Sequence, residues 1–79
     1  MNVDYVVGVL KDAGFCGDGN ILTKGDVSVT VRDRTVLVSY KFGIVGFNID
    51  GLYIDYSALG WIGVLSISDK DGACMVLVV

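Results

Sequence analysis

Apolar residues follow two different spacings along the chain, and the change between them divides it into two parts. Over residues 2–14, valine, leucine and alanine recur at intervals of three and four, the spacing of one helix face. Over residues 26–79, apolar and polar residues alternate, as in half-buried strands. The pattern predicts one α+β domain over 1–79, in which a helix and a loop over 15–25 precede an antiparallel β-meander.

Capping signals support the predicted helix. Asn2 is suited to the N-cap position. At the other end, Gly14 can adopt the left-handed conformation that ends many helices, and Phe15 would then contact Leu10. These signals outweigh the poor helix propensity of the central segment, where Gly8 costs about 1 kcal/mol relative to alanine.

Turn signals divide the second part into about six strands. The strongest hairpin signal is Asp50-Gly51. Further turns are expected at 32–35, 42–43, 57–60 and 69–72. The expected cross-strand pairs include Val31 with Val36, Tyr40 with Val45, Phe47 with Ile54 and Tyr56 with Trp61. In this register the apolar residues of all strands fall on one face of a single sheet.

Such a sheet is too wide for one helix to cover. Six strands span about 24 Å, whereas a helix is about 10–12 Å wide. We therefore expect the sheet to curl towards a barrel, or part of its apolar face to be covered by another chain.

The composition also indicates surplus apolar surface. Of the 79 residues, 53% are hydrophobic and 19% are charged, whereas an average soluble chain has about 45–50% apolar and about 25% charged residues. No apolar run approaches the ~20 residues of a membrane-spanning helix. The excess therefore points to a self-association surface or a partner surface.

The sequence offers little catalytic chemistry. It has no histidine, which removes the usual general base and the usual zinc ligand. The Asp18-Gly19-Asn20 segment lacks the spacing of a calcium loop. Asp50 is expected in a turn and Asp55 on a solvated strand face, so they do not suggest a glycosidase pair. We predict that the chain is not an enzyme and uses no metal or cofactor.

The charge of the chain indicates which kind of partner to expect, and its cysteine content indicates which cellular compartment to expect. The net charge is −3 and the six basic residues are scattered, so direct binding to nucleic acid is disfavoured and a basic protein partner is favoured. Cys16 and Cys74 fit no metal or redox motif and are expected as free thiols. The first residues lack the basic region of a signal peptide, so we expect a cytoplasmic protein without membrane association.

A partner-binding patch is predicted on the outer face of the last two strands. Cys74 and Val76 are expected in the core with Leu65 and Ile67, which directs their neighbours outward. The predicted binding residues are Ile62, Val64, Met75, Leu77 and Val79, with Tyr53 and Asp55. A large exposed apolar patch usually marks an interaction site.

These features favour a small acidic interaction module without catalytic activity. The hypothesis is an inhibitor or regulator, of the kind carried by phages or other mobile elements, that occludes a larger basic, nucleic-acid-binding protein. One alternative is a homo-oligomer, such as a homodimer, that assembles through its C-terminal strands. A second alternative is a small-ligand-binding β-barrel.

Overall fold

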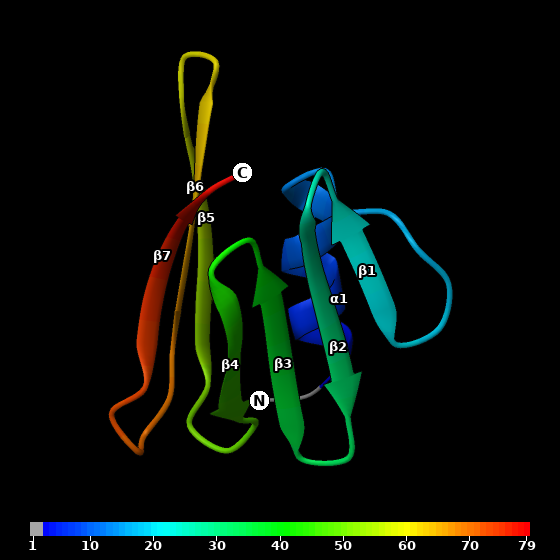
Figure 1. Cartoon of the computed structure of the whole chain (residues 1–79), viewed down its shortest axis with the longest axis vertical. Helices are drawn as coiled ribbons and strands as arrows, with labels where there is room; N and C mark the ends of the chain where they lie inside the picture. Colours follow the sequence, from blue (N-terminus) through cyan, green and yellow to red (C-terminus); the bar gives the residue numbers. More distant parts are fainter. Residues whose placement is uncertain (1–2) are drawn as a thin grey trace.

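The computed structural model describes residues 3–79 and contains one helix and two antiparallel sheets (Figure 1). Helix α1 (Val3–Asp12) precedes the strands. The strands are β1 (Ile21–Lys24), β2 (Val27–Arg32), β3 (Thr35–Tyr40), β4 (Gly43–Asn48), β5 (Tyr53–Leu59), β6 (Ile62–Ser68) and β7 (Cys74–Val78). The four-stranded sheet has the order β1-β2-β3-β4, and the three-stranded sheet has the order β5-β6-β7. The predicted α+β class is confirmed.

The helix ends as its capping signals predict, although its last residue is Asp12 rather than residue 14. Gly14 has φ +96°, and its N–H donates to the carbonyl of Lys11 at 3.0 Å. The N–H of Phe15 donates to the carbonyl of Leu10 at 2.9 Å, which completes a Schellman ending. The predicted cap residue Asn2 lies outside the described residues.

The segment 15–25, predicted to be a loop, contains β1. This short strand pairs with β2 over its whole length, and contacts with two further residues hold its other side. Thr23 exchanges two backbone hydrogen bonds with Cys16, at 2.8 and 2.9 Å, and Nζ of Lys24 donates to the carbonyl of Ala13 at 2.6 Å. Leu22 supplies the buried side chain of the strand. A four-residue strand with one buried residue has too little alternation to be recognised from its pattern.

The prediction of one continuous sheet is wrong between β4 and β5. The Asp50-Gly51 turn does form, and Gly51 has φ +70°. The chain then leaves for a second sheet, so Phe47 pairs with Val36 and not with Ile54. Neither sheet closes on itself, so a closed barrel, which was one of the alternatives for covering the apolar face, does not form.

In the β3–β4 and β5–β6 hairpins the registers differ from the prediction by even numbers of residues, whereas the β6–β7 register differs by one residue. The β2–β3 register is as expected. Tyr40 pairs with Gly43, two residues before the expected partner, and Tyr56 pairs with Leu65, four residues beyond it. Even shifts leave each side chain on its predicted face.

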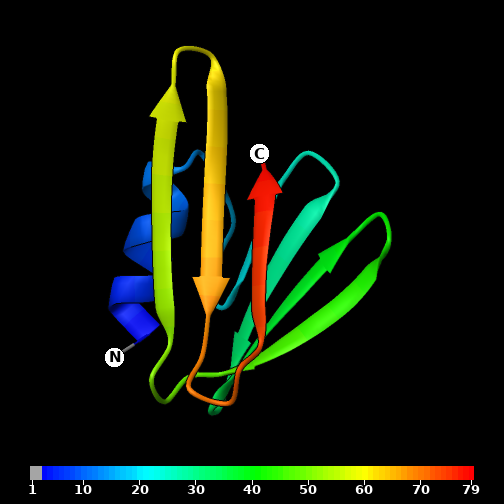
Figure 2. The same ribbon diagram turned by 90° about the vertical axis from the view of Figure 1, so that its left-hand side faces the viewer.

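The core has three walls. In Figure 1 the four-stranded sheet is seen face-on with α1 behind it, and the three-stranded sheet is seen edge-on. Figure 2 shows α1 lying beside β5. The most deeply buried side chains come from all three walls: Val6, Leu10, Leu22, Val29, Val36, Val38, Phe47, Ile54, Leu65 and Ile67. The apolar faces of the strands, which one helix is too narrow to cover, are thus largely covered because the strands form two sheets that enclose the core together with the helix.

Candidate partner-binding surface

No other element formed by residues 3–79 lies in front of the face of the three-stranded sheet that points away from the core (Figure 2). We call it the uncovered face. The strand registers assign to it Tyr53, Asp55, Ser57 and Leu59 from β5, Ile62, Val64, Ser66 and Ser68 from β6, and Cys74, Val76 and Val78 from β7. Asp55 is its one charged residue, so the surface is apolar and weakly polar.

Four of the predicted binding residues lie on the uncovered face. Ile62 and Val64 point outward from β6, and Tyr53 and Asp55 point outward from β5. Tyr53 is 55% exposed and Ile62 is 42% exposed. Their position is as expected from the sequence, while their contact with a partner stays a prediction.

The side chains of the other three predicted residues lie on the inner face of the sheet and not on the predicted outer face. These residues are Met75, Leu77 and Val79. Leu77 is paired with Leu65 on the inner side of the sheet, and all three side chains are partly buried against the core. The outward positions of β7 belong to Cys74, Val76 and Val78. The reason is the β6–β7 loop, which holds five residues rather than four and so reverses the two faces of the last strand.

Among residues 3–79, the most exposed large apolar side chain, Trp61, lies at the tip of the β5–β6 hairpin. The hairpin extends beyond the other elements, and its end stands clear of both the helix and the four-stranded sheet (Figures 1 and 2). Gly60, with φ +64°, makes the turn, and Trp61 beside it is 94% exposed. Leu59 is 72% exposed. We call Leu59, Gly60, Trp61 and Ile62 the hairpin tip.

The hairpin tip was missed because Trp61 was expected to pair with Tyr56 inside the sheet. The register is instead set by a two-residue turn, Gly60-Trp61, with Leu59 opposite Ile62. One sequence signal was available: no charged residue occurs between Asp55 and Asp69. A longer hairpin could therefore extend out of the sheet with an apolar end.

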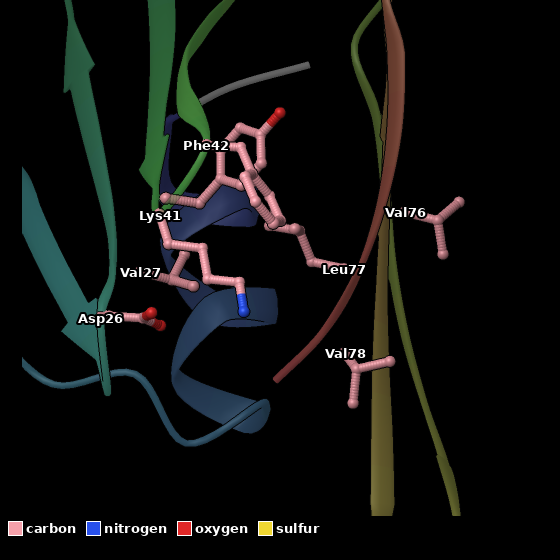
Figure 3. A pocket seen from close by; sticks show the side chains of 8 residues that line it. Asp26, Val27, Lys41, Phe42, Val76, Leu77 and Val78 are labelled. Carbon is pink, nitrogen blue, oxygen red and sulfur yellow. The ribbon is translucent and has the colours of Figure 1, made fainter.

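A groove runs along the β7 edge of the three-stranded sheet (Figure 3). Its volume is about 370 Å³, and β7 forms one wall while the β3–β4 turn forms the opposite wall. Leu77 points across the groove towards Phe42, whereas Val76 and Val78 point away from it. Asp26 and Lys41 also line it, so it contains one charge of each sign.

The carboxylates with altered acidity have structural partners. Asp50 forms an ion pair with Arg34, and this hydrogen bond lowers the pKa of the Asp50 carboxyl below its usual range. The pKa of Asp69 is also lowered, chiefly because its carboxylate accepts the N–H of Asn48 at 2.8 Å. Neither carboxylate is available as a general acid near neutral pH.

The other candidates for chemistry are dispersed. Asp55 lies on the uncovered face, and Cys16 and Cys74 are free, exposed thiols. Cys74 was expected in the core and instead lies on the uncovered face. Within residues 3–79, no three side chains of the metal-binding types are grouped so that they could hold an ion.

Comparison with known proteins gives no relative. No protein-family model matches the chain, and neither the curated proteins nor the solved structures contain a match to it. Among the helices formed by residues 3–79, none has the length and apolar character needed to cross a membrane.

Proposed function

We propose that this chain is a small acidic protein-interaction module without catalytic activity. In this proposal it is an inhibitor or regulator that binds and occludes a larger basic protein, such as one that binds nucleic acid. The binding surface comprises the uncovered face and the hairpin tip.

The observation that carries the proposal is the exposure of Trp61 at the end of a hairpin that has no charged residue over 56–68. A tryptophan side chain buries a large area when it enters a pocket, and tryptophan is enriched among the residues that dominate binding energy. Leu59 and Ile62 flank it and are exposed as well. The tip can thus act as an anchor that inserts into a cavity of the partner.

The distribution of charge supports a basic partner. The chain has a net charge of −3, yet the uncovered face has only Asp55 as a charged residue. The partner would therefore be attracted by charges around the interface and held by apolar contacts within it. The two exposed free thiols, Cys16 and Cys74, suit a reducing compartment, and we propose the cytoplasm.

The test is affinity purification from the native host with two matched variants. Trp61→Ser removes the aromatic anchor, and Ile44→Ser removes an apolar side chain that is 69% exposed on the four-stranded sheet. We expect a basic protein that binds the wild type and Ile44→Ser and is lost with Trp61→Ser. Its affinity should fall as salt is added. A partner retained equally by both variants would contradict the proposed surface.

A homo-oligomer is the second candidate, because β7 is an edge strand without any charged residue. Light scattering over a range of protein concentrations distinguishes the two. A stable dimer whose mass is unchanged by Trp61→Ser and reduced by changes in β7 would favour this candidate.

A further inference from the structure

Strand β7 is an open sheet edge whose hydrogen-bonding groups can be assigned. The N–H of Val79 donates to the carbonyl of Gly63 at 2.9 Å, and the N–H of Asp69 donates to the carbonyl of Ala73 at 3.0 Å. Opposite residues in an antiparallel pair alternate between hydrogen-bonded and non-hydrogen-bonded positions. Cys74, Val76 and Val78 therefore direct their N–H and C=O groups away from β6.

These outward groups have no backbone partner within residues 3–79, since β7 pairs only with β6. They repeat at every second residue, about 6.8 Å apart. Such a row of alternating donors and acceptors is complementary to the backbone of another extended strand.

Each of the other sheet edges has a feature that limits the addition of a strand. On β1, both outward groups of Thr23 are bonded to Cys16. On β4, the outward N–H of Asn48 is bonded to Asp69, and the rest of that edge contains Gly43 and Gly46, which weaken strand pairing. Strand β5 lies beside α1. Among the sheet edges formed by residues 3–79, β7 has none of these protections, and its sequence contains no charge, glycine or proline that would discourage pairing.

The groove described above lies along this open edge. Val76, Leu77 and Val78 form its β7 wall, and Phe42, which is 79% exposed, stands opposite (Figure 3). A strand added to β7 would direct alternate side chains into the groove, against Leu77 and Phe42. Its other side chains would extend the uncovered face beside Val76 and Val78.

We infer that β7 accepts an extended, uncharged segment of a partner protein as an eighth strand. This inference rests on the proposed function and specifies how the partner docks. The groove charges, Asp26 and Lys41, cancel, and β7 has none, so the complementary segment is a run of β-branched or other apolar residues.

A partner segment fits this edge better than a second copy of β7. A two-fold axis through two paired β7 strands would keep the inner faces of both three-stranded sheets on the same side. Each copy would then bring its own Phe42 turn to the inner side of the junction, so two such turns would have to be accommodated there. A segment without such a turn meets no such obstacle.

The test uses a synthetic peptide of alternating valine and threonine with a lysine at each end, added to the full chain. Amide hydrogen exchange is followed residue by residue. We expect exchange at Cys74, Val76 and Val78 to slow at least about tenfold at saturating peptide, with Ile44 and Gly46 on β4 unchanged. The same peptide N-methylated at alternate residues should give no protection.

Two variants at position 76 separate the contribution of the backbone to peptide binding from that of the side chain. Val76→Pro removes one outward N–H and leaves the bonds to β6 in place, a position where edge strands tolerate proline. Val76→Thr keeps the N–H and the branched shape. We expect Val76→Pro to weaken binding about tenfold and Val76→Thr to bind like the wild type, both with unchanged circular dichroism.

Three results would overturn the inference. The first is that Val76→Pro binds the peptide as tightly as the wild type. The second is that the peptide protects amides of β4, or no amides at all, from exchange. The third is that protection of the β7 amides rises with protein concentration in the absence of peptide. A native partner lost with Trp61→Ser but retained by Val76→Pro would reject strand addition and leave the proposed function standing.

Discussion

The N–H of Asn48 donates to Oδ2 of Asp69 at 2.8 Å and joins the last residue of β4 to the residue that follows β6. The other oxygen, Oδ1, accepts the N–H groups of Asp71 and Ala73, both at 3.0 Å. One carboxylate thus shapes the β6–β7 loop and connects the two sheets near the point where the chain crosses between them.

Asp69→Ala should lower the thermal midpoint of unfolding because three backbone N–H groups lose their acceptor. Asp69→Asn, which retains one acceptor oxygen, should have a smaller effect. Asp71→Ala is the matched control, since the Asp71 carboxylate has only a 3.4 Å contact with Nδ2 of Asn48. Differential scanning calorimetry ranks the three, and equal midpoints would contradict the role of Asp69.

The lowered pKa values of Asp50 and Asp69 predict sensitivity to acid. A carboxyl with a lower pKa in the folded state contributes stability above its unfolded pKa of about 4, and this contribution is lost as the pH falls through the folded pKa. The thermal midpoint should therefore decline below a pH of about 4. In Asp69→Asn the decline should be shallower, and an identical pH profile would exclude Asp69 as a cause.

Leu65 and Trp61, both on the β5–β6 hairpin, should differ sharply in their effect on stability. Leu65 is fully buried, so Leu65→Ala should cost about 2–5 kcal/mol of unfolding free energy. Trp61 is 94% exposed, so Trp61→Ser should change it by no more than about 0.5 kcal/mol. Urea titration measures both. A strongly destabilised Trp61→Ser would show that the hairpin tip packs against the protein.

Two glycine-to-alanine substitutions should change the stability of the fold in opposite directions. Gly8 lies inside α1, and an added Cβ meets nothing within 4 Å, so Gly8→Ala should stabilise the fold by about 1 kcal/mol. At Gly17 an added Cβ would lie 2.1 Å from the carbonyl oxygen of Ile21, so Gly17→Ala should be destabilising. Thermal melts of the two variants check the prediction, and a stabilised Gly17→Ala would contradict the close approach at that loop.

Periodicity can assign a residue to a face only where the two faces differ. In β2, valine alternates with serine and threonine, and the observed burial follows that alternation. Residues 73–79 are all apolar, so the pattern contains no information about which of them face the core. The length of the preceding loop decided their direction, and Asp69 shapes that loop.

The sequence by itself determined the helix and its Schellman ending, the alternating strands and most of their inward residues, because these depend on local backbone preferences and on periodicity. The tertiary structure decided where the sheet divides, how far each hairpin extends and which side of β7 is exposed. Those features depend on contacts between distant residues, such as Asn48 with Asp69 and Thr23 with Cys16. Shifts of two or four residues preserve the apolar pattern, so only packing in three dimensions distinguishes among them.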